Sequence, residues 1–234
     1  MEISPTYKKR VEILREFGEE PTSANGRWRI SDLRSRGIVT PVSRTWCRIG
    51  QERRFVIQQG DREKELVRIA RRIAENVCAW SIRELNPLVV HQRTRRLIFV
   101  EVEKGAMKRV FEEFLDQRFR NVYLETDTKW VMSHVGGSDY DVFVRQLVTR
   151  APLEDVKKGI PSLEKIIVDL FEDGFVYGVS RSPDLAHLIR NAFSTYSIDV
   201  RTLRTYARRR GNYDHLSKFI EWLAVVPPEV LRDP

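Results

Sequence analysis

The feature that most constrains the fold is the run LIFVEV at residues 97–102, which consists almost entirely of β-branched, aromatic and other apolar residues. Such a run predicts a buried β-strand. It lies between two stretches, residues 62–76 and 105–117, whose apolar residues recur at helical spacing. Further short strands are predicted at residues 77–82, 122–124, 130–134 and 142–148. Strands that alternate with helices predict an α/β layer.

The first sixty residues follow a different order. Residues 5–17 predict one helix, and residues 22–36 predict a second that ends at Gly37. The predicted buried contacts of the second helix are Trp28, Ile30 and Leu33. Residues 38–49 then predict a tight β-hairpin. Two helices, a glycine stop and a hairpin are the order of elements in a winged helix-turn-helix.

The remainder of the chain is predicted to be helical from Pro161 onward, with a frayed tail after Pro227. The apolar fraction of 41% is ordinary for a globular protein. We therefore predict an α/β fold in three parts. These are a winged helix-turn-helix at residues 1–58, an α/β domain at 59–150 and a helical C-terminal part at 151–234, the last two forming separate units or one.

The charge of the chain is unevenly distributed. The formal net charge is +8, which favours acidic partners, usually nucleic acid. Residues 1–60 carry 12 Lys and Arg against 7 Asp and Glu, whereas residues 152–234 carry 12 of each. Between Arg27 and Arg54 there are eight Arg but only two acids, Asp32 and Glu52.

This basic segment is the candidate DNA-binding site. Arg and Lys contact phosphates, Arg reads guanine, and Asn reads adenine in the major groove. The candidate DNA-binding residues are Ser23, Asn25, Arg27, Arg29, Arg34, Arg36, Arg44 and Arg48. The alternative is a solvated basic face on an adaptor that binds protein. Later in the chain, Arg208-Arg209-Arg210 before Gly211 fits a helix C-terminus at least as well as a second nucleic-acid patch.

Several other classes of site are not indicated. Cys47 and Cys78 lie in apolar surroundings, so we expect buried thiols in a reducing compartment. The four His are scattered, and neither a metal site nor a cofactor is predicted. The N-terminus lacks an apolar signal region, and no apolar run reaches the ~18 residues that span a bilayer. We therefore expect a cytoplasmic protein that has no membrane partner.

One acidic segment suggests an enzymatic alternative. Glu101, Glu103 and Lys104 end the predicted strand, and this is similar to the metal-binding strand of restriction-type nucleases. In those nucleases an acid precedes the lysine by two residues, whereas here that position is Val102. The simpler explanation is that Glu101, Glu103 and Lys104 end a strand and pack their charged side chains against the following helix.

A second segment is similar to a nucleotidyltransferase signature. Gly137-Ser138 is followed by Asp139 and Asp141 in the right order, but too closely for the intervening helix, so a β-turn is favoured. We predict that the chain is not an enzyme and has no catalytic residues. The alternative is a Mg²⁺-dependent nuclease or nucleotidyltransferase that uses Glu101, Glu103 and Asp169 or Asp139.

Five segments together resemble one known family. They are RWRISDLRSRGIVTPVSRTW (27–46), FVEVEKGAMKRVFEEFL (99–115), RAPLEDV (150–156), PSLEKIIVDLF (161–171) and YSIDVRTLRTYARRRG (196–211). The chain resembles the antitoxins of AbiEi-type, type IV toxin–antitoxin systems, which act in abortive infection as a phage defence.

The resemblance implies an N-terminal winged helix, a C-terminal α/β domain and no catalytic residues. It further implies a repressor that regulates its own operon by binding double-stranded DNA at its own promoter. The implied functional partner is a nucleotidyltransferase-like toxin, whose activity the antitoxin counters without a stable complex. A homodimer would match a palindromic operator, since operator symmetry mirrors protein symmetry.

Overall fold

The computed structural model describes residues 5–20, 24–89, 97–124, 140–173 and 183–233. The chain divides into two compact units: unit 1 comprises residues 1–55 and 188–234, and unit 2 comprises residues 56–187. The first boundary lies close to the expected one at residue 58. The expected C-terminal part does not stay together, because residues 151–187 belong to unit 2 and residues 188–234 to unit 1.

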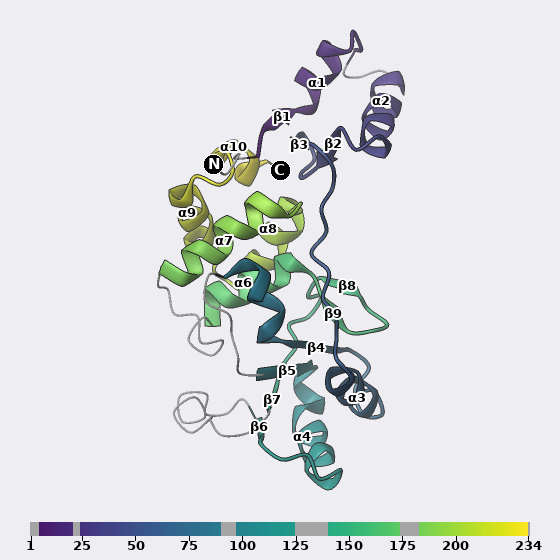
Figure 1. The fold of residues 1–234 in the computed structure, drawn as a ribbon, viewed down its shortest axis with the longest axis vertical. Helices are drawn as coiled ribbons and strands as arrows, with labels where there is room; N and C mark the ends of the chain where they lie inside the picture. The colour runs from purple at the N-terminus through teal and green to yellow at the C-terminus, as the bar shows by residue number, and fades with distance from the viewer. Residues whose placement is uncertain (1–4, 21–23, 90–96, 125–139, 174–182, 234) are drawn as a thin grey trace. The chain divides into compact units, whose positions relative to one another are not determined.

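The N-terminal part of unit 1 is a small three-stranded antiparallel sheet with two helices. Its elements are β1 (Tyr7–Lys9), α1 (Arg10–Glu16), α2 (Ala24–Ser35), β2 (Val39–Pro41) and β3 (Trp46–Ile49) (Figure 1). The strands lie in the order β1-β3-β2. The helices and the hairpin share one apolar core of Ile13, Leu14, Ile30, Leu33, Val39 and Cys47. The predicted hairpin is therefore present, and Cys47 is a buried free thiol as expected.

The prediction of a single helix over residues 5–17 is wrong at its start. Tyr7–Lys9 instead form β1, where Tyr7 pairs with Arg48 and Lys9 with Trp46. The helix begins at Arg10, whose N–H donates to the carbonyl of Thr45 at 2.7 Å. These hydrogen bonds join residues about 35 to 40 positions apart, so a local pattern does not reveal them.

The C-terminal part of unit 1 is helical. It contains the end of α7 (Pro183–Thr195), α8 (Val200–Arg209), α9 (Tyr213–Leu223) and α10 (Pro228–Arg232). The predicted frayed tail is wrong, because Val230 and Leu231 of α10 are fully buried and Asp233 is nearly so. Pro228 starts this helix, as proline does in a first helical turn.

Unit 2 is built on a four-stranded mixed sheet. Its elements are α3 (Asp61–Ala70), β4 (Val77–Ser81), a 3₁₀ helix (Ile82–Leu88), β5 (Leu97–Val102), a second 3₁₀ turn (Lys104–Ala106), α4 (Met107–Asp116), β6 (Val122–Leu124), β7 (Asp141–Gln146), β8 (Leu153–Asp155), β9 (Ile160–Pro161) and α6 (Leu163–Asp173). The strand order is β4-β5-β7-β6, with β4 antiparallel to β5 and the other pairs parallel. This confirms the α/β class. The strand expected at residues 130–134 lies outside the described residues.

The two faces of this sheet differ in chemistry. On one face, apolar side chains from the strands pack against α3 and α4 in a single core, whose members include Leu66, Ile98, Val100, Val110 and Phe114. The residues that alternate with them point to the other face, among them Cys78, Trp80, Phe99, Glu101, Phe143 and Arg145. The second face is therefore aromatic and charged, and Lys165 of α6 supplies the counter-charge to Glu101.

A short hairpin, β8–β9, was not expected from the sequence. It adds to β4, since the N–H of Ala79 donates to the carbonyl of Gly159 at 2.9 Å. Gly159 has φ +66°, and a Cβ atom there would lie 2.5 Å from the carbonyl oxygen of Val77. Glycine is the residue that combines this backbone conformation with so close an approach.

Candidate nucleic-acid interface

The outward face of α2 is polar, basic and partly aromatic. Gly26, Ile30 and Leu33 are buried on the inner side of the helix. The exposed side chains that follow α2 along its opposite side are Arg27, Trp28, Ser31, Arg34 and Ser35. Because residues three and four apart share a face, these five form one surface rather than a scatter. We call these five residues the α2 face.

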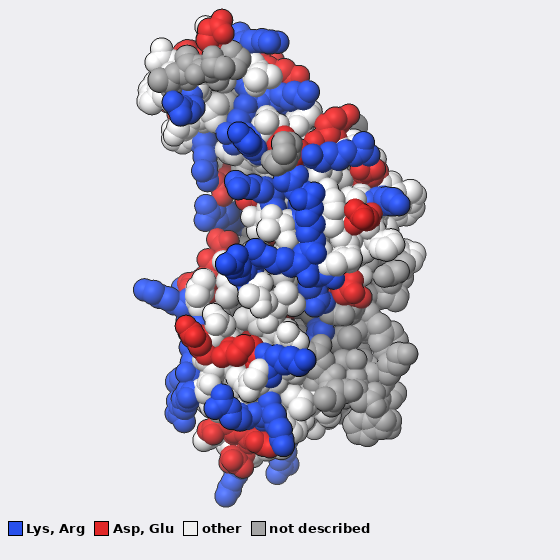
Figure 2. Space-filling model, turned by 180° about the vertical axis from the view of Figure 1, so that it is seen from behind, with Lys and Arg blue, Asp and Glu red and all other residues white. Residues whose placement is uncertain are grey.

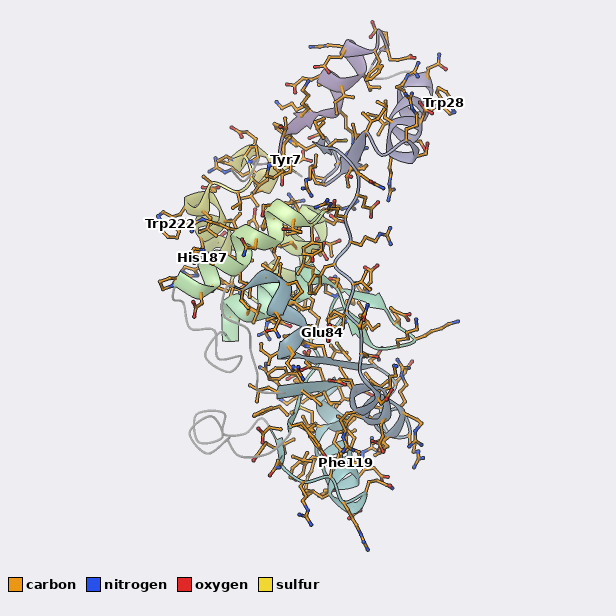
Figure 3. The ribbon with its side chains drawn as sticks, in the orientation of Figure 1. Tyr7, Trp28, Glu84, Phe119, His187 and Trp222 are labelled. Atoms are coloured by element: carbon orange, nitrogen blue, oxygen red, sulfur yellow. The ribbon has the colours of Figure 1, made fainter. Side chains whose placement is uncertain are left out.

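Trp28 is exposed, so its expected place in the core is wrong. Its relative exposure is 62%, and Figure 3 shows it pointing outward from α2. The guanidinium of Arg29 lies 5.5 Å from the Trp28 ring and 5.8 Å from the ring of Phe17, which is also exposed. The periodicity of α2 explains the error, since Ile30 and Leu33 face the core while Trp28 lies opposite them. A tryptophan that adds nothing to a core is a candidate contact residue.

Five of the predicted DNA-binding residues are exposed on this part of unit 1, and three of them, Asn25, Arg27 and Arg44, form no ion pair with another described residue. Asn25 and Arg27 lie in the first turn of α2, and Arg44 lies at the tip of the turn between β2 and β3. Neither Arg27 nor Arg44 has an acidic partner within the described part of the chain. Both guanidinium groups are therefore available to an anion. Ser23 lies outside the described residues.

Two further predicted arginines share one acid. The guanidinium of Arg29 lies 3.4 Å from Glu19 and 3.7 Å from Asp32, and that of Arg36 lies 3.5 Å from Asp32. Arg29 is half-buried, whereas Arg36 is exposed. These ion pairs hold the side chains in place at the edge of α2, and exposed pairs of this kind contribute little stability.

Arg34 of the α2 face pairs with an acid from the segment after β3. Its guanidinium lies 3.2 Å from Glu52, which also accepts a hydrogen bond of 2.8 Å from Arg54. Burial by itself would raise the pKa of Glu52, but the hydrogen bonds from Arg54 and Arg34 hold that pKa below its ordinary value. A phosphate group would therefore compete with Glu52 for Arg34.

Arg48 has a structural role within unit 1. Its guanidinium donates to the carbonyl of Ser194 at 2.8 Å and to the hydroxyl of Ser197 at 3.5 Å. It also lies near Tyr7, whose pKa burial raises to about 12 although Arg48 lowers it in part. Arg48 therefore fastens β3 to the C-terminal segment.

The turn between β2 and β3 is fixed by Asp233. We call residues 42–45 the hairpin turn. The Asp233 carboxylate accepts hydrogen bonds from the Ser43 hydroxyl at 2.5 Å, the Thr45 hydroxyl at 2.6 Å and the Thr45 N–H at 2.9 Å. Burial would raise the pKa of Asp233, but these hydrogen bonds and the charge of Arg204 together lower it. The position of Arg44 is therefore set by a residue almost two hundred positions away.

The net charge of the whole chain resides in unit 1. Its residues include 20 Lys and Arg against 12 Asp and Glu, whereas unit 2 contains 21 of each. Figure 2 shows Lys and Arg side chains gathered on one face of unit 1. The basic character thus extends beyond the N-terminal segment, because the C-terminal helices add three net charges to the same unit.

Two of the acids considered for metal chemistry meet in unit 2, where they bind a lysine. The Lys165 ammonium lies 2.7 and 2.8 Å from the two carboxylate oxygens of Glu101 and 2.6 Å from Asp169. The three side chains are 0%, 4% and 5% exposed. The indole N–H of Trp80 donates to Glu101 at 3.2 Å. We call Glu101, Lys165 and Asp169 the buried triad; it joins α6 to β5.

Glu103 lies apart from the buried triad. Its carboxylate accepts the backbone N–H groups of Glu75 and Asn76 at 2.9 and 3.2 Å, and so closes the loop after α3. Cys78 is a free thiol beside the triad; burial raises its pKa well above the ordinary value, with Lys165 opposing the effect. Among the described residues, no three His, Cys, Asp or Glu are grouped as metal ligands. Asp139 lies outside those residues.

The fold and the charge distribution together define a mixed α/β protein with one strongly basic unit. The chain belongs to the family of unknown function DUF6577, whose model matches residues 25–224. The matched range begins at α2 and ends just after α9, so it contains most of the candidate interface. No curated protein matches the chain. Within the described residues, none of the helices has the length and apolar character needed to cross a bilayer.

Proposed function

We propose that unit 1 contains a winged helix-turn-helix that binds double-stranded DNA. The order β1-α1-α2-β2-β3 and the sheet order β1-β3-β2 support this assignment. In it, α1 and α2 form the helix-turn-helix, α2 is the recognition helix, and β2, β3 and the hairpin turn form the wing. A recognition helix enters the major groove and uses its N-terminal residues to contact base edges.

The observation that carries the proposal is the α2 face, which lies opposite the core in the unit that holds the entire net charge. Asn25 and Arg27, at the start of α2, have side chains that can read adenine and guanine. Trp28 offers an apolar surface to a thymine methyl group. Arg44 at the wing tip contacts a phosphate, which fixes orientation without reading sequence.

We further propose that the protein is the repressor of its own promoter and the antitoxin of a type IV toxin–antitoxin system. This rests on the resemblance of five segments to AbiEi-type antitoxins. The partner would be a nucleotidyltransferase-like toxin, countered without a stable complex, and both would act in the cytoplasm. A homodimer would suit a palindromic operator. The antitoxin proposal is tested by co-expressing the protein with a toxin encoded beside its gene; the proposal expects the protein to restore the growth that the toxin stops.

The DNA-binding proposal is tested by measuring the affinity of the protein for its own upstream promoter at several salt concentrations, with a scrambled duplex as the control. Selective binding whose affinity falls steeply with salt is expected. The double variant Arg27→Ala, Arg44→Ala should lower the slope of log affinity against log salt by about one, since Arg44 is the phosphate contact of the pair and each such contact contributes about 0.9. The loss of Arg27 should in addition reduce the preference for the promoter over the scrambled duplex. Lys64→Ala, Lys108→Ala removes the same charge from exposed sites in unit 2 and should leave the slope unchanged.

Equal binding to both duplexes, or none, would overturn the repressor proposal and favour an adaptor whose basic face binds an acidic protein. The Mg²⁺-dependent alternative gains no support from the geometry. Glu101 and Asp169 direct their carboxylates at the Lys165 ammonium, and Glu103 is used by main-chain N–H groups. We therefore propose no catalytic role for these acids.

A further inference from the structure

A second basic surface of unit 1 lies on α8. From Val200 to Tyr213 the sequence contains five Arg and no Asp or Glu. Asp199 caps the helix by accepting the N–H of Thr202 at 3.1 Å. The side chains that α8 buries are Val200, Leu203, Arg204, Tyr206 and Ala207. Arg201, Thr205 and Arg208 are exposed along the other side, at positions i, i+4 and i+7.

This surface begins beside the wing. The N–H of Val200 donates to the carbonyl of Val42 at 2.9 Å, so the first turn of α8 is hydrogen-bonded to the hairpin turn that carries Arg44. Both Arg44 and Arg201 are exposed, and each lies within two residues of this hydrogen bond. The first exposed arginine of α8, Arg201, therefore lies near Arg44, the exposed arginine of the wing.

The connection between α8 and the wing is held at several points. Asp233, after α10, binds Ser43 and Thr45 of the hairpin turn and lies near Arg204 of α8. Arg48 of β3 also binds the carbonyl of Ser194 in the last turn of α7, the helix that precedes α8. These contacts involve both side chains and main chain, so the wing and α8 form one preorganised surface. Preorganisation lowers the entropic cost of binding.

The guanidinium of Arg208 is also held in place. It lies over the ring of Tyr213 at 4.9 Å, in cation–π geometry. Arg201 and Arg208 are seven residues apart, which is about 10 Å along a helix at ~1.5 Å per residue. This separation lets the two side chains reach different phosphates of one duplex.

We infer that the exposed face of α8, with Arg201 and Arg208, is a second phosphate-binding surface that continues from the wing along the same DNA duplex. The inference rests on the proposed DNA-binding function and adds a contact made by the C-terminal segment. Arg201 and Arg208 lie on α8, outside α2, the helix that the proposed function places in the major groove. This surface therefore contributes affinity and orientation rather than sequence recognition.

The test is the double variant Arg201→Ala, Arg208→Ala of the full chain, measured by fluorescence anisotropy on promoter and scrambled duplexes at several salt concentrations. Affinity should fall about tenfold or more for both duplexes alike, and the salt slope should fall by about two. Arg201→Lys, Arg208→Lys should retain most of the slope, since the charge remains. Lys64→Ala, Lys108→Ala serves as the charge-matched control, and circular dichroism checks that helix content is unchanged.

The outcomes separate the two proposals. If Arg201→Ala, Arg208→Ala binds with the wild-type affinity and slope while Arg27→Ala, Arg44→Ala does not, the α8 surface is refuted and the winged helix stands. If the wild-type protein itself shows no salt-dependent DNA binding, the proposed function fails. A loss confined to the promoter duplex would also refute the inference, because it would indicate base recognition by α8.

Discussion

Replacement of Lys165 by Met should destabilise unit 2 strongly. The change removes the ammonium that contacts three carboxylate oxygens at 2.6–2.8 Å and leaves Glu101 and Asp169 in the interior without it. Removing one partner of a buried ion pair typically costs about 3–5 kcal/mol. Arg145 lies opposite Glu101 on β7 and keeps one positive charge on the same face, so we expect about 3 kcal/mol, near the lower end of that range.

The assay is urea and thermal unfolding followed by far-ultraviolet circular dichroism. A loss of about 3 kcal/mol corresponds to a fall in Tm of roughly 6–12 °C for a chain of this size. Lys158→Met is the matched control, because Lys158 is exposed and pairs with Asp155 at 3.4 Å. Its loss should cost at most about 1 kcal/mol.

A compensated variant tests the reasoning from the opposite direction. Lys165→Met, Asp169→Leu removes the lysine together with one acid, and leaves Glu101 opposite Arg145 with the hydrogen bond from Trp80 intact. Much of the lost stability should return, because neutral, well-packed replacements of buried ion pairs are often close to neutral in effect. If Lys165→Met costs under about 1 kcal/mol, or if the double variant is no better than the single one, the buried triad does not hold α6 as we argue.

Three other changes address unit 1. Trp28→Ala should weaken promoter binding about tenfold while altering the free energy of unfolding by no more than ~0.5 kcal/mol, since the side chain is largely exposed. Glu52→Gln should strengthen DNA binding about two- to fivefold by releasing Arg34, as measured by anisotropy. Asp233→Asn should cost about 1–3 kcal/mol at pH 7, because an amide oxygen cannot replace both carboxylate oxygens toward the hairpin turn. Because the pKa of Asp233 is lowered on folding, this difference should be fully present above about pH 5, and should shrink as the pH falls below about 4 and through the lowered pKa of the folded state.

Each of these has a clear opposing result. Unchanged DNA binding by Trp28→Ala would remove the tryptophan from the interface, and a lower Tm would give it a structural role instead. Weaker binding by Glu52→Gln would show that the acid orients Arg34 rather than competing for it. For Asp233→Asn, the control is Glu229→Gln, which changes an exposed carboxylate on the nearby helix α10. Equal effects of the two variants on stability would contradict the argument that Asp233 fixes the hairpin turn.

The elements that the sequence predicted best are those set by local pattern. The strand at residues 97–102 is present with the expected bounds, because an unbroken run of β-forming residues needs no information from elsewhere. The predicted hairpin likewise follows from two short apolar stretches and a turn. In the candidate site, a basic α2 and a basic hairpin turn are predictable because charge density is visible in the sequence; the structure shows that Arg27 and Arg44 are exposed, while their role stays a proposal.

The features that were missed depend on contacts between distant residues. Tyr7–Lys9 form a strand because they pair with β3. Asp233, which follows α10, is held in place because the hairpin turn donates hydrogen bonds to its carboxylate. Hydrophobicity alone predicts that Trp28 is buried, but the helical phase of α2 puts its side chain opposite that of Leu33. The helical phase of Trp28 is visible in the sequence, and it is the signal that predicts an exposed side chain. Nothing local could have assigned residues 188–234 to the same unit as residues 1–55.

Unit 1 is assembled from two segments that leave the ribosome at different times. Residues 1–55 emerge first, and residues 188–234 follow only after the whole of unit 2 has been made. At about 5–20 residues per second, this interval is on the order of ten seconds. During it, Arg48 has no Ser194 to bind, and the hairpin turn has no Asp233. A nascent or truncated chain would thus carry β1–β3 without the contacts that fix the hairpin turn. If unit 1 binds DNA as we propose, the complete binding surface would form only when synthesis has passed Asp233.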